Sequence, residues 1–152
     1  MEVFSFTNDD LGDIMEISRR MHAESPNYRD LPFDHIAVGA WAAMHIRADN
    51  MAAWGVRSPR DELIGGMFAR IEPTYFGPAT VAIEDALYVA PNYRGSRAAH
   101  RLLGAFAFWA KENNVDRMVV TPSTGINEDR ACGFLEKLGF HKAATSMVKD
   151  LG

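Results

Sequence analysis

The sequence predicts an α/β (α+β) fold, in which helices are combined with a mixed β-sheet. Segments with the period of a strand or of a helix follow one another in the order β-α-α-β-β-β-α-β-α-β. A strand, a helix and another strand between residues 80 and 121 imply a parallel pair joined by a right-handed crossover. The length of 152 residues and the apolar content of 47% suit one domain with its own core, so residues 1–152 are expected to form a single domain.

The first third of the chain predicts one strand and two helices. Residues 2–6 alternate loosely, as a strand does. Residues 7–10 (TNDD) offer a capping side chain followed by acids, which favours the start of a helix that ends near His22. The segment 24–32 contains two prolines and is expected to be a loop, after which a second helix begins at Asp34 and continues to Arg47.

The middle of the chain predicts three strands. Residues 51–57 and 62–72 form two of them, joined by a turn at residues 58–61. The pair Gly65-Gly66 inside the second strand indicates a bulge or a close approach of two backbones. Residues 80–89 form the third and longest strand.

The last third predicts two helices and two strands. A helix over residues 96–113 is followed by a strand of buried type at 117–121. A second helix spans 127–138, and Gly139 is its expected C-cap. Residues 140–148 are expected to close the sheet as its last strand.

Composition excludes several classes of function. The net charge of −4 and the pI of about 5.7 argue against a nucleic-acid-binding protein. The lone cysteine, Cys132, allows no intrachain disulfide, suits a reducing cytoplasmic setting and is expected to be a buried structural thiol. The five histidines have no metal-ligand spacing, so no metal site is expected, and each is expected to be a surface or hydrogen-bonded histidine. The N-terminus lacks the pattern of a signal peptide, and no apolar run is long enough for a membrane span.

The joint between the strand 80–89 and the following helix has the chemistry of an anion site. A helix N-terminus presents unpaired N–H groups and a partial positive charge. Gly95 allows a ligand to approach the backbone, and Arg94 and Arg97 add two full charges. The alternative is that both arginines are solvated and that Gly95 only forms a turn.

Two motifs resemble the GNAT superfamily of N-acetyltransferases. The strand end V-A-P-N-Y-R-G followed by a helix resembles the acetyl-CoA loop of that family, usually written Q/R-x-x-G-x-G/A, with Arg94 at the first position and Ala99 at the last. Arg97 stands where the middle glycine belongs. The stretch ACGFLEKLGF at 131–140 resembles the family pattern A-x-x-F-Y-E-K-L-G-F. The short stretches LPFD, YRGSRAA and STGI are similar to a divergent branch common in phages and their bacterial hosts.

The resemblance implies a central mixed sheet with helices on both faces and a site for acetyl-CoA as co-substrate. The pyrophosphate is expected at the backbone N–H groups of the loop, and the pantetheine arm beside the preceding strand end and near Asn127, which is otherwise a plain N-cap. The cofactor-binding residues are then Leu87, Val89, Arg94, Gly95, Ser96, Arg97, Ala98, Ala99 and Asn127. Arg97 either contacts a phosphate or points to solvent.

Acetyl transfer to an amine requires a base, and two acids stand where the family tends to place one. An amine with a pKa of about 10.4 is neutral in only about 0.04% of molecules at pH 7, a deficit of about 4.6 kcal/mol. Glu84 and Asp85 lie on the strand that leads into the loop, and Glu84 is the first choice. Neighbouring strand residues face opposite sides, so only one acts unless Ala86 marks a bulge. The alternative is a solvated or ion-paired acid.

The thiolate that leaves also needs a proton, and the family often supplies it from a tyrosine. Leu135 occupies that position here, which predicts a slower or unusual enzyme before an inactive one. A thiol pKa of about 8.5 lies only about 2 kcal/mol above pH 7 as a leaving group, so water or another hydroxyl can help. Tyr88, Ser123 and Thr124 are candidate substitutes, although each also suits the core or a turn.

The sequence thus predicts an acetyl-CoA-dependent N-acetyltransferase that acts on a primary amine of a small molecule or protein by direct attack on the thioester. The alternative is a weak or inactive binding module on the same fold that docks to a partner protein, which the departures at Arg97 and Leu135 motivate. The segments 22–35 and 73–79 are expected to choose the acceptor. The oligomeric state stays open between a monomer and the homodimer that is common in the family. Four aromatic residues are candidates for an acceptor pocket or for the core: Trp41, Trp54, Tyr75 and Phe76.

Overall fold

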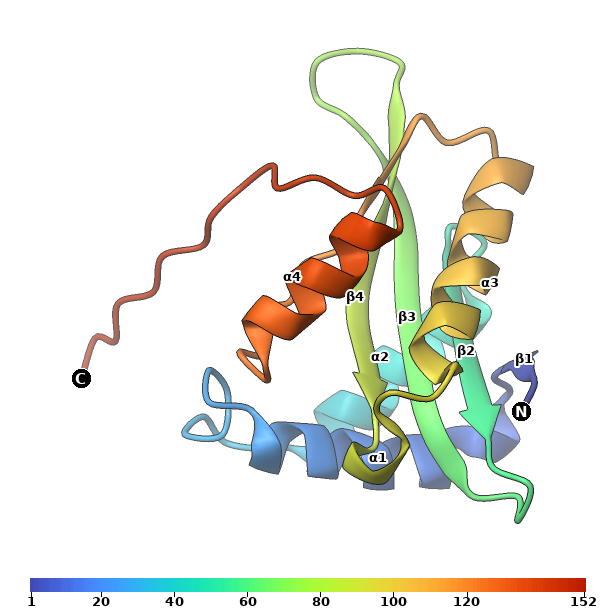
Figure 1. The fold of residues 1–152 in the computed structure, drawn as a ribbon, viewed down its shortest axis with the longest axis vertical. Helices are drawn as coiled ribbons and strands as arrows, with labels where there is room; N and C mark the ends of the chain where they lie inside the picture. The colour runs from blue at the N-terminus through green and yellow to red at the C-terminus, as the bar shows by residue number, and fades with distance from the viewer.

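The computed structural model describes residues 1–152 and contains a five-stranded sheet with helices on both faces (Figure 1). The strands lie in chain order, β1-β2-β3-β4-β5, with bounds Val3–Ser5, Met51–Arg57, Leu63–Pro73, Thr80–Val89 and Arg117–Val119. The pairs β1–β2, β2–β3 and β3–β4 are antiparallel, and β5 is parallel to β4. The predicted α/β fold, with its one parallel pair, is therefore confirmed.

Four α-helices accompany these strands, close to the predicted positions, and α4 follows the last strand. Their bounds are Leu11–Glu24 for α1, His35–Arg47 for α2, Ala98–Glu112 for α3 and Glu128–Lys137 for α4. Short 3₁₀ turns precede α1 (η1, Asn8–Asp10) and follow β4 (η2, Pro91–Tyr93). Thr7 caps η1 in a capping box with Asp10, and the Asp34 carboxylate accepts from two N–H groups of α2. Gly139 adopts a φ of +94° directly after α4, as a C-cap glycine does.

The sheet separates two apolar clusters. On one face, Leu102, Leu103 and Phe106 of α3 and Leu135 of α4 pack against β2, β3 and β4. On the other face, Ile14 and Ile17 of α1 and Ala42 of α2 pack against the same strands. Because both faces are covered, the expected arrangement of helices is confirmed.

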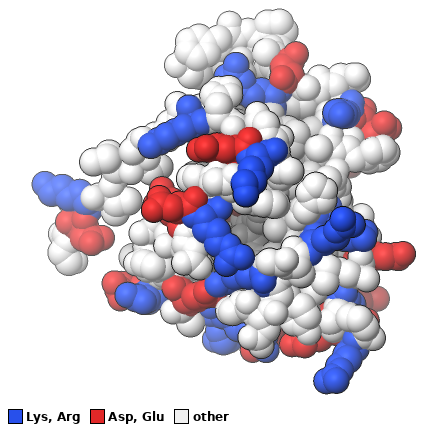
Figure 2. Space-filling view, in the orientation of Figure 1, with Lys and Arg blue, Asp and Glu red and all other residues white.

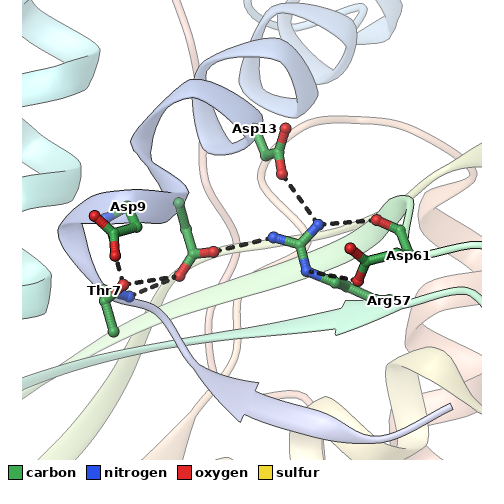
Figure 3. A network of polar contacts seen from close by, with 6 residues as sticks. Thr7, Asp9, Asp13, Arg57 and Asp61 are labelled. Atoms are coloured by element: carbon green, nitrogen blue, oxygen red, sulfur yellow. Dashed lines mark hydrogen bonds and ion pairs between the residues drawn. The ribbon is translucent and has the colours of Figure 1, made fainter.

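A cluster of ion pairs holds the start of α1 against the end of β2 (Figure 3). The Arg57 guanidinium lies 3.0 Å from a carboxylate oxygen of Asp10 and 3.0 Å from one of Asp13. It also donates to the backbone carbonyl of Asp61 in the β2–β3 turn, at 3.1 Å. One half-buried guanidinium therefore ties together a helix, a strand end and a turn.

Two irregularities in the sheet bear on the site. The register between β2 and β3 shifts beside the predicted glycine pair, and a Cβ atom at Gly65 would lie 3.2 Å from the carbonyl oxygen of Tyr88. The register between β3 and β4 also shifts, because Phe68 pairs with Ala86 while Ala69 pairs with Glu84. Asp85 is thus an extra residue in β4, so the bulge considered at Ala86 lies one residue earlier.

The last strand was predicted wrongly. Residues 140–148 form no strand, and residues 141–152 are exposed and make no backbone hydrogen bond. The chain runs away from the body after α4 (Figure 1). As a result β5 pairs only with β4. The strand predicted at 117–121 to be of buried type is this β5, which is a partly exposed edge strand.

The loop at 73–79 also differs from expectation. Tyr75 and Phe76 are 90% and 81% exposed, and they pack on each other with ring centroids 3.9 Å apart. They belong neither to the core nor to an acceptor pocket. No helix in the structure combines the length and the apolar character that crossing a bilayer requires.

Candidate functional site

A cavity opens where β4 and β5 separate. The two strands pair over only three residues, Val81–Ile83 with Arg117–Val119. Beyond that point the cavity, with a volume of about 610 Å³, is lined by residues of 84–89 on one side and 120–124 on the other. Its walls also include residues of α1 and α2, which cover one face of the sheet, and of α3 and α4, which cover the other. The cavity therefore passes through the gap in the sheet.

The N-terminus of α3 lies at one end of this cavity and presents unpaired N–H groups. The backbone N–H groups of Gly95, Arg97, Ala99 and His100 make no hydrogen bond, and the N–H of Ala98 donates to Ser96 Oγ at 3.2 Å. Gly95 has a φ of +86°, a conformation that glycine adopts without strain. Several unpaired donors at the positive end of a 15-residue helix can bind a phosphate group. Figure 2 shows the face of the molecule that is seen in Figure 1, with a hollow near its centre and Lys and Arg side chains on the border of the hollow.

Arg94 binds the protein rather than facing solvent. Its guanidinium makes two contacts with the Glu24 carboxylate, of which the one from Nη2 measures 2.8 Å, and its Nε donates to the Val89 carbonyl at 3.0 Å. The Tyr88 hydroxyl donates to the same carboxylate at 2.7 Å. The hydrogen bonds from Arg94 hold the pKa of Glu24 below its usual value. Arg94 therefore fixes the loop to the end of α1.

Glu84 is a buried carboxyl group at the point where the strands part. It is 8% exposed, and one carboxyl oxygen accepts a hydrogen bond from the Thr121 N–H at 3.1 Å. Burial raises the pKa of Glu84 to about 7, although the Thr121 amide acts in the opposite direction. A carboxyl group with this pKa can accept a proton near neutral pH.

Asp85 lies in a second, fully paired cluster because the bulge turns it to the α2 face. His45 Nε2 lies 2.7 Å from one oxygen of Asp85, and Arg70 contacts the other oxygen. His45 Nδ1 lies 2.9 Å from the Trp41 carbonyl, which can only accept, so Nδ1 holds a proton. Burial lowers the pKa of His45, yet at 2.7 Å a proton must also lie between Nε2 and the Asp85 oxygen. The cluster therefore contains at least as much positive charge as negative charge.

Most of the residues predicted for the site come together in this cavity. Its wall contains Glu84, Asp85, Leu87, Tyr88, Val89, Arg94, Gly95, Ser96, Ala99 and Asn127. Ala98 is buried beneath the loop, and the Arg97 side chain is exposed and makes no ion pair. Asn127 occupies the N-cap position of α4 with a φ of +46°, but its side chain makes no capping hydrogen bond. The side chain of Leu135 is buried in the wall. Cys132 was expected to be buried, but it is only half-buried.

Four residues of the site were missed from the sequence: Glu24, His45, Arg70 and Arg130. Glu24 and His45 lie 70 and 40 residues from their partners along the chain, and no local spacing indicates either contact. Arg130 on α4 was detectable in principle, because it lies one residue before the ACGFLEKLGF motif. Its Nη2 atom lies 3.6 Å from the place that a Cβ atom would take at Gly95. No group of three or more His, Cys, Asp or Glu side chains is arranged to hold a metal.

Comparison with protein families gives a match over most of the chain. The model of the acetyltransferase (GNAT) family matches residues 13–140. No curated protein matches the sequence.

Solved structures of acetyltransferases resemble the whole fold. A Trypanosoma brucei acetyltransferase has a TM-score of 0.75 at 20% identity, over 99% of both chains. A ribosomal-protein-alanine N-acetyltransferase from Brucella melitensis has a TM-score of 0.70 at 16% identity, over 99% of this chain and 100% of that chain. The aminoglycoside acetyltransferase AAC(6′)-Iy, solved with a CoA-containing bisubstrate analog, has a TM-score of 0.76 at 17% identity, over 99% of this chain and 97% of that chain. At these identities the likeness shows the fold.

Proposed function

The chain belongs to the acetyltransferase (GNAT) family, and from that premise we propose that it transfers an acetyl group from acetyl-CoA to a primary amine. The observation that supports this best is Glu84, a buried carboxyl group with a pKa of about 7 in the gap through which an amine can reach the other face of the sheet. A purely structural carboxyl would be expected to have a cationic partner, and Glu84 has none.

The residues present suit acetyl-CoA. The unpaired N–H groups from Gly95 to His100 would hold the pyrophosphate, with Arg130 beside them. Beyond Ile83 the edge of β4 has no strand partner, so the backbone at Leu87 and Val89 would lie beside the pantetheine arm. Asn127, whose side chain makes no capping bond, lines the same wall. In this assignment Arg94 supports the loop through Glu24, and the exposed Arg97 contacts a phosphate only at the outer edge.

Glu84 would act as the base. The amine nitrogen forms a bond to the thioester carbonyl carbon, the proton of the amine passes to Glu84, directly or through a water molecule, and the C–S bond breaks. CoA leaves as a thiolate and takes up a proton. Glu84 then returns its own proton to solvent before the next cycle. A base whose pKa lies near the working pH is well matched to this task.

Asp85 and Tyr88 would hold the surroundings of the base in place. Asp85 is occupied by His45 and Arg70, and Tyr88 donates its only proton to Glu24. Burial and the Glu24 carboxylate raise the pKa of Tyr88 to about 12, which makes it a weak acid toward a thiolate. Since Leu135 offers no proton either, we assign the protonation of the thiolate to water, and Tyr88→Phe is then expected to change kcat less than tenfold.

Three measurements test this function with purified protein. Acetyl-CoA should raise the melting temperature, a panel of primary amines should release free CoA thiol, and Glu84→Gln should lower kcat by roughly 10²–10⁴ while acetyl-CoA still binds. If acetyl-CoA binds but no amine in a broad panel is acetylated, the protein is a binding module and the enzymatic assignment fails.

The homodimer that is common in the family belongs to the same proposal. The outer edge of β5 is unpaired, and the exposed segment 141–152 carries the apolar side chains Met147, Val148 and Leu151 on its surface. An open sheet edge favours pairing with an extended strand from another chain. A second copy could supply that strand, so light scattering should give twice the chain mass, and deletion of residues 141–152 should give a monomer.

A further inference from the structure

We infer from the charges of the cavity that the acceptor is a monoamine with an uncharged apolar or aromatic body, and that a second ammonium group near the first makes a compound a poor acceptor. This inference rests on the proposed function and narrows its substrate class. It concerns the part of the cavity that faces α1 and α2, on the opposite side of the sheet from the N-terminus of α3.

Acidic side chains are scarce in this cavity, and only one of them is uncompensated. Glu84 and Asp85 are the only acids in the wall, which also contains Arg94, Arg130 and His22. Asp85 is contacted by Arg70 on one oxygen and by His45 on the other. The Nε atom of Arg70 also lies 2.7 Å from a carboxylate oxygen of Glu72. Whether the shared proton resides on the imidazole or on the carboxyl, the charges of these four groups add up to zero, so Asp85 has no net charge to offer a ligand.

The nearest other acid is also compensated. Glu24, just behind the wall, is bound by both Nη atoms of Arg94 and by the Tyr88 hydroxyl. Glu84 therefore remains the single acid without a cationic partner, and in the proposed reaction it serves the amine that is acetylated. A second ammonium group would find no carboxylate of its own.

The rest of the acceptor side is apolar or neutral. Met21, Trp41 and Ile126 contribute apolar surface, and Tyr28, which is 43% exposed, contributes an aromatic ring at the opening. Three hydrogen bonds hold the 123–124 loop against the loop after α1: Ser25 Oγ to the Thr124 carbonyl at 2.5 Å, Asn27 Nδ2 to the Ser123 carbonyl at 2.8 Å, and the Asn27 N–H to the Thr124 carbonyl at 3.3 Å. These bonds use backbone oxygens that could otherwise accept from an ammonium group.

The cavity therefore disfavours a second ammonium group, because no carboxylate is left to pair with it. Moving an ammonium group out of water without a carboxylate to receive it is strongly unfavourable, whereas an alkyl or aromatic group gains from leaving water. A site that leaves a polar group of the wrong ligand unpaired discriminates well against that ligand. The inference separates this chain from the aminoglycoside acetyltransferase that shares its fold, because aminoglycosides contain several amines.

Two acceptors that differ only in the distal group test the inference: pentylamine and 1,5-diaminopentane. We expect kcat/KM for pentylamine to exceed that for the diamine by roughly tenfold or more, even though the diamine has two reactive ends. Ser123→Asp adds a carboxylate at the wall and should shift the ratio toward the diamine, whereas the matched neutral variant Ser123→Asn should leave the ratio unchanged.

The outcomes separate this inference from the proposed function. Equal or better turnover of the diamine by the unmodified protein would overturn the inference and leave the acetyltransferase assignment intact. A preference for pentylamine that Ser123→Asp and Ser123→Asn change equally would also overturn it, because the preference would then not depend on charge. Failure to acetylate either compound or any other amine, with acetyl-CoA bound, would instead overturn the proposed function.

Discussion

Replacing Glu84 by glutamine should remove activity and at the same time stabilise the protein above neutral pH. The carboxyl group is 8% exposed, and its pKa rises from an ordinary 4.5 to about 7 because burial disfavours the charged form. The folded protein therefore binds this proton more tightly than the unfolded chain does. Glutamine has nearly the same shape, stays uncharged and can still accept the hydrogen bond from the Thr121 N–H.

The size and the pH range of the effect follow from the two pKa values. Between pH 4.5 and 7 the folded state binds more protons at Glu84 than the unfolded state, so the free energy of unfolding falls as pH rises through this window. Below pH 4.5 the group imposes no penalty, and above pH 7 the penalty is complete. With about 1.4 kcal/mol per pH unit, it reaches about 3 kcal/mol at pH 8.

Urea denaturation of both proteins at several pH values between 4 and 8 measures this difference. The Glu84→Gln variant should match the original protein near pH 4 and exceed it by about 3 kcal/mol at pH 8, since all other titrating groups are common to both. If the difference in the free energy of unfolding between the two proteins does not change with pH, burial does not raise the pKa of Glu84, and the reasoning is refuted. Glu62→Gln, at an exposed carboxylate, is a suitable control and should show no such divergence.

The kinetic counterpart uses an amine of low basicity, such as 2,2,2-trifluoroethylamine, whose own titration lies below the pKa of Glu84. With that acceptor, kcat should rise with pH and level off above about 7, as Glu84 loses its proton. Glu84→Gln should abolish this rise together with most of the rate. A variant that kept a normal rate and the same profile would show that another group is the base.

Three further predictions concern the groups around the gap. Arg130→Ala should weaken acetyl-CoA binding about fivefold, as expected for one charged contact worth about 1 kcal/mol, and Arg97→Ala should have a smaller effect, which calorimetry can measure. Glu24→Gln should lower the free energy of unfolding, measured by urea titration, by about 1–2 kcal/mol at pH 7. Because the pKa of Glu24 is lowered in the folded state, this loss should shrink as the pH falls below about 4.5. His45→Ala should destabilise by about 2–4 kcal/mol in the same assay, since it leaves both a cavity and an incompletely paired Asp85, and a change below about 1 kcal/mol would contradict the paired cluster.

The fold could be predicted from local pattern wherever a segment has a covered face. The strand at 80–89 agrees with β4 at both ends, and the strand at 51–57 agrees with β2, because each is an apolar run that turn residues bound on both sides. The segment 140–148 has the composition of a strand as well. A strand also has to pair with an edge, however, and the sequence of the segment does not show that it leaves the open outer edge of β5 unpaired.

The loop of the site was predictable because its chemistry is contiguous, and the paired clusters were not. Arg94 to Ala99 lie in a row, so their spacing predicts an anion site, with solvated arginines as the alternative. His45 meets Asp85 only because β4 gains an extra residue that turns this carboxylate toward α2, and one bulge changes which face every neighbouring residue occupies. The charge state of the site depends on these distant pairings and had to be obtained from the structure.

The pairing of Asp85 and Glu24 also protects the pKa on which the proposed chemistry depends. An unpaired arginine in the gap would favour the ionised form of Glu84 and return its pKa toward 4.5, where a carboxylate is a poor base. Arg70 and Arg94 are instead bound to carboxylates, and Arg130, which makes no ion pair, lies beside Gly95. Burial and the Thr121 amide are the two influences on the pKa of Glu84. Three acids at one gap thus differ: two neutralise the arginines that hold the sheet and the loop, and the third, Glu84, titrates near neutral pH and in its ionised form would accept the proton of the amine.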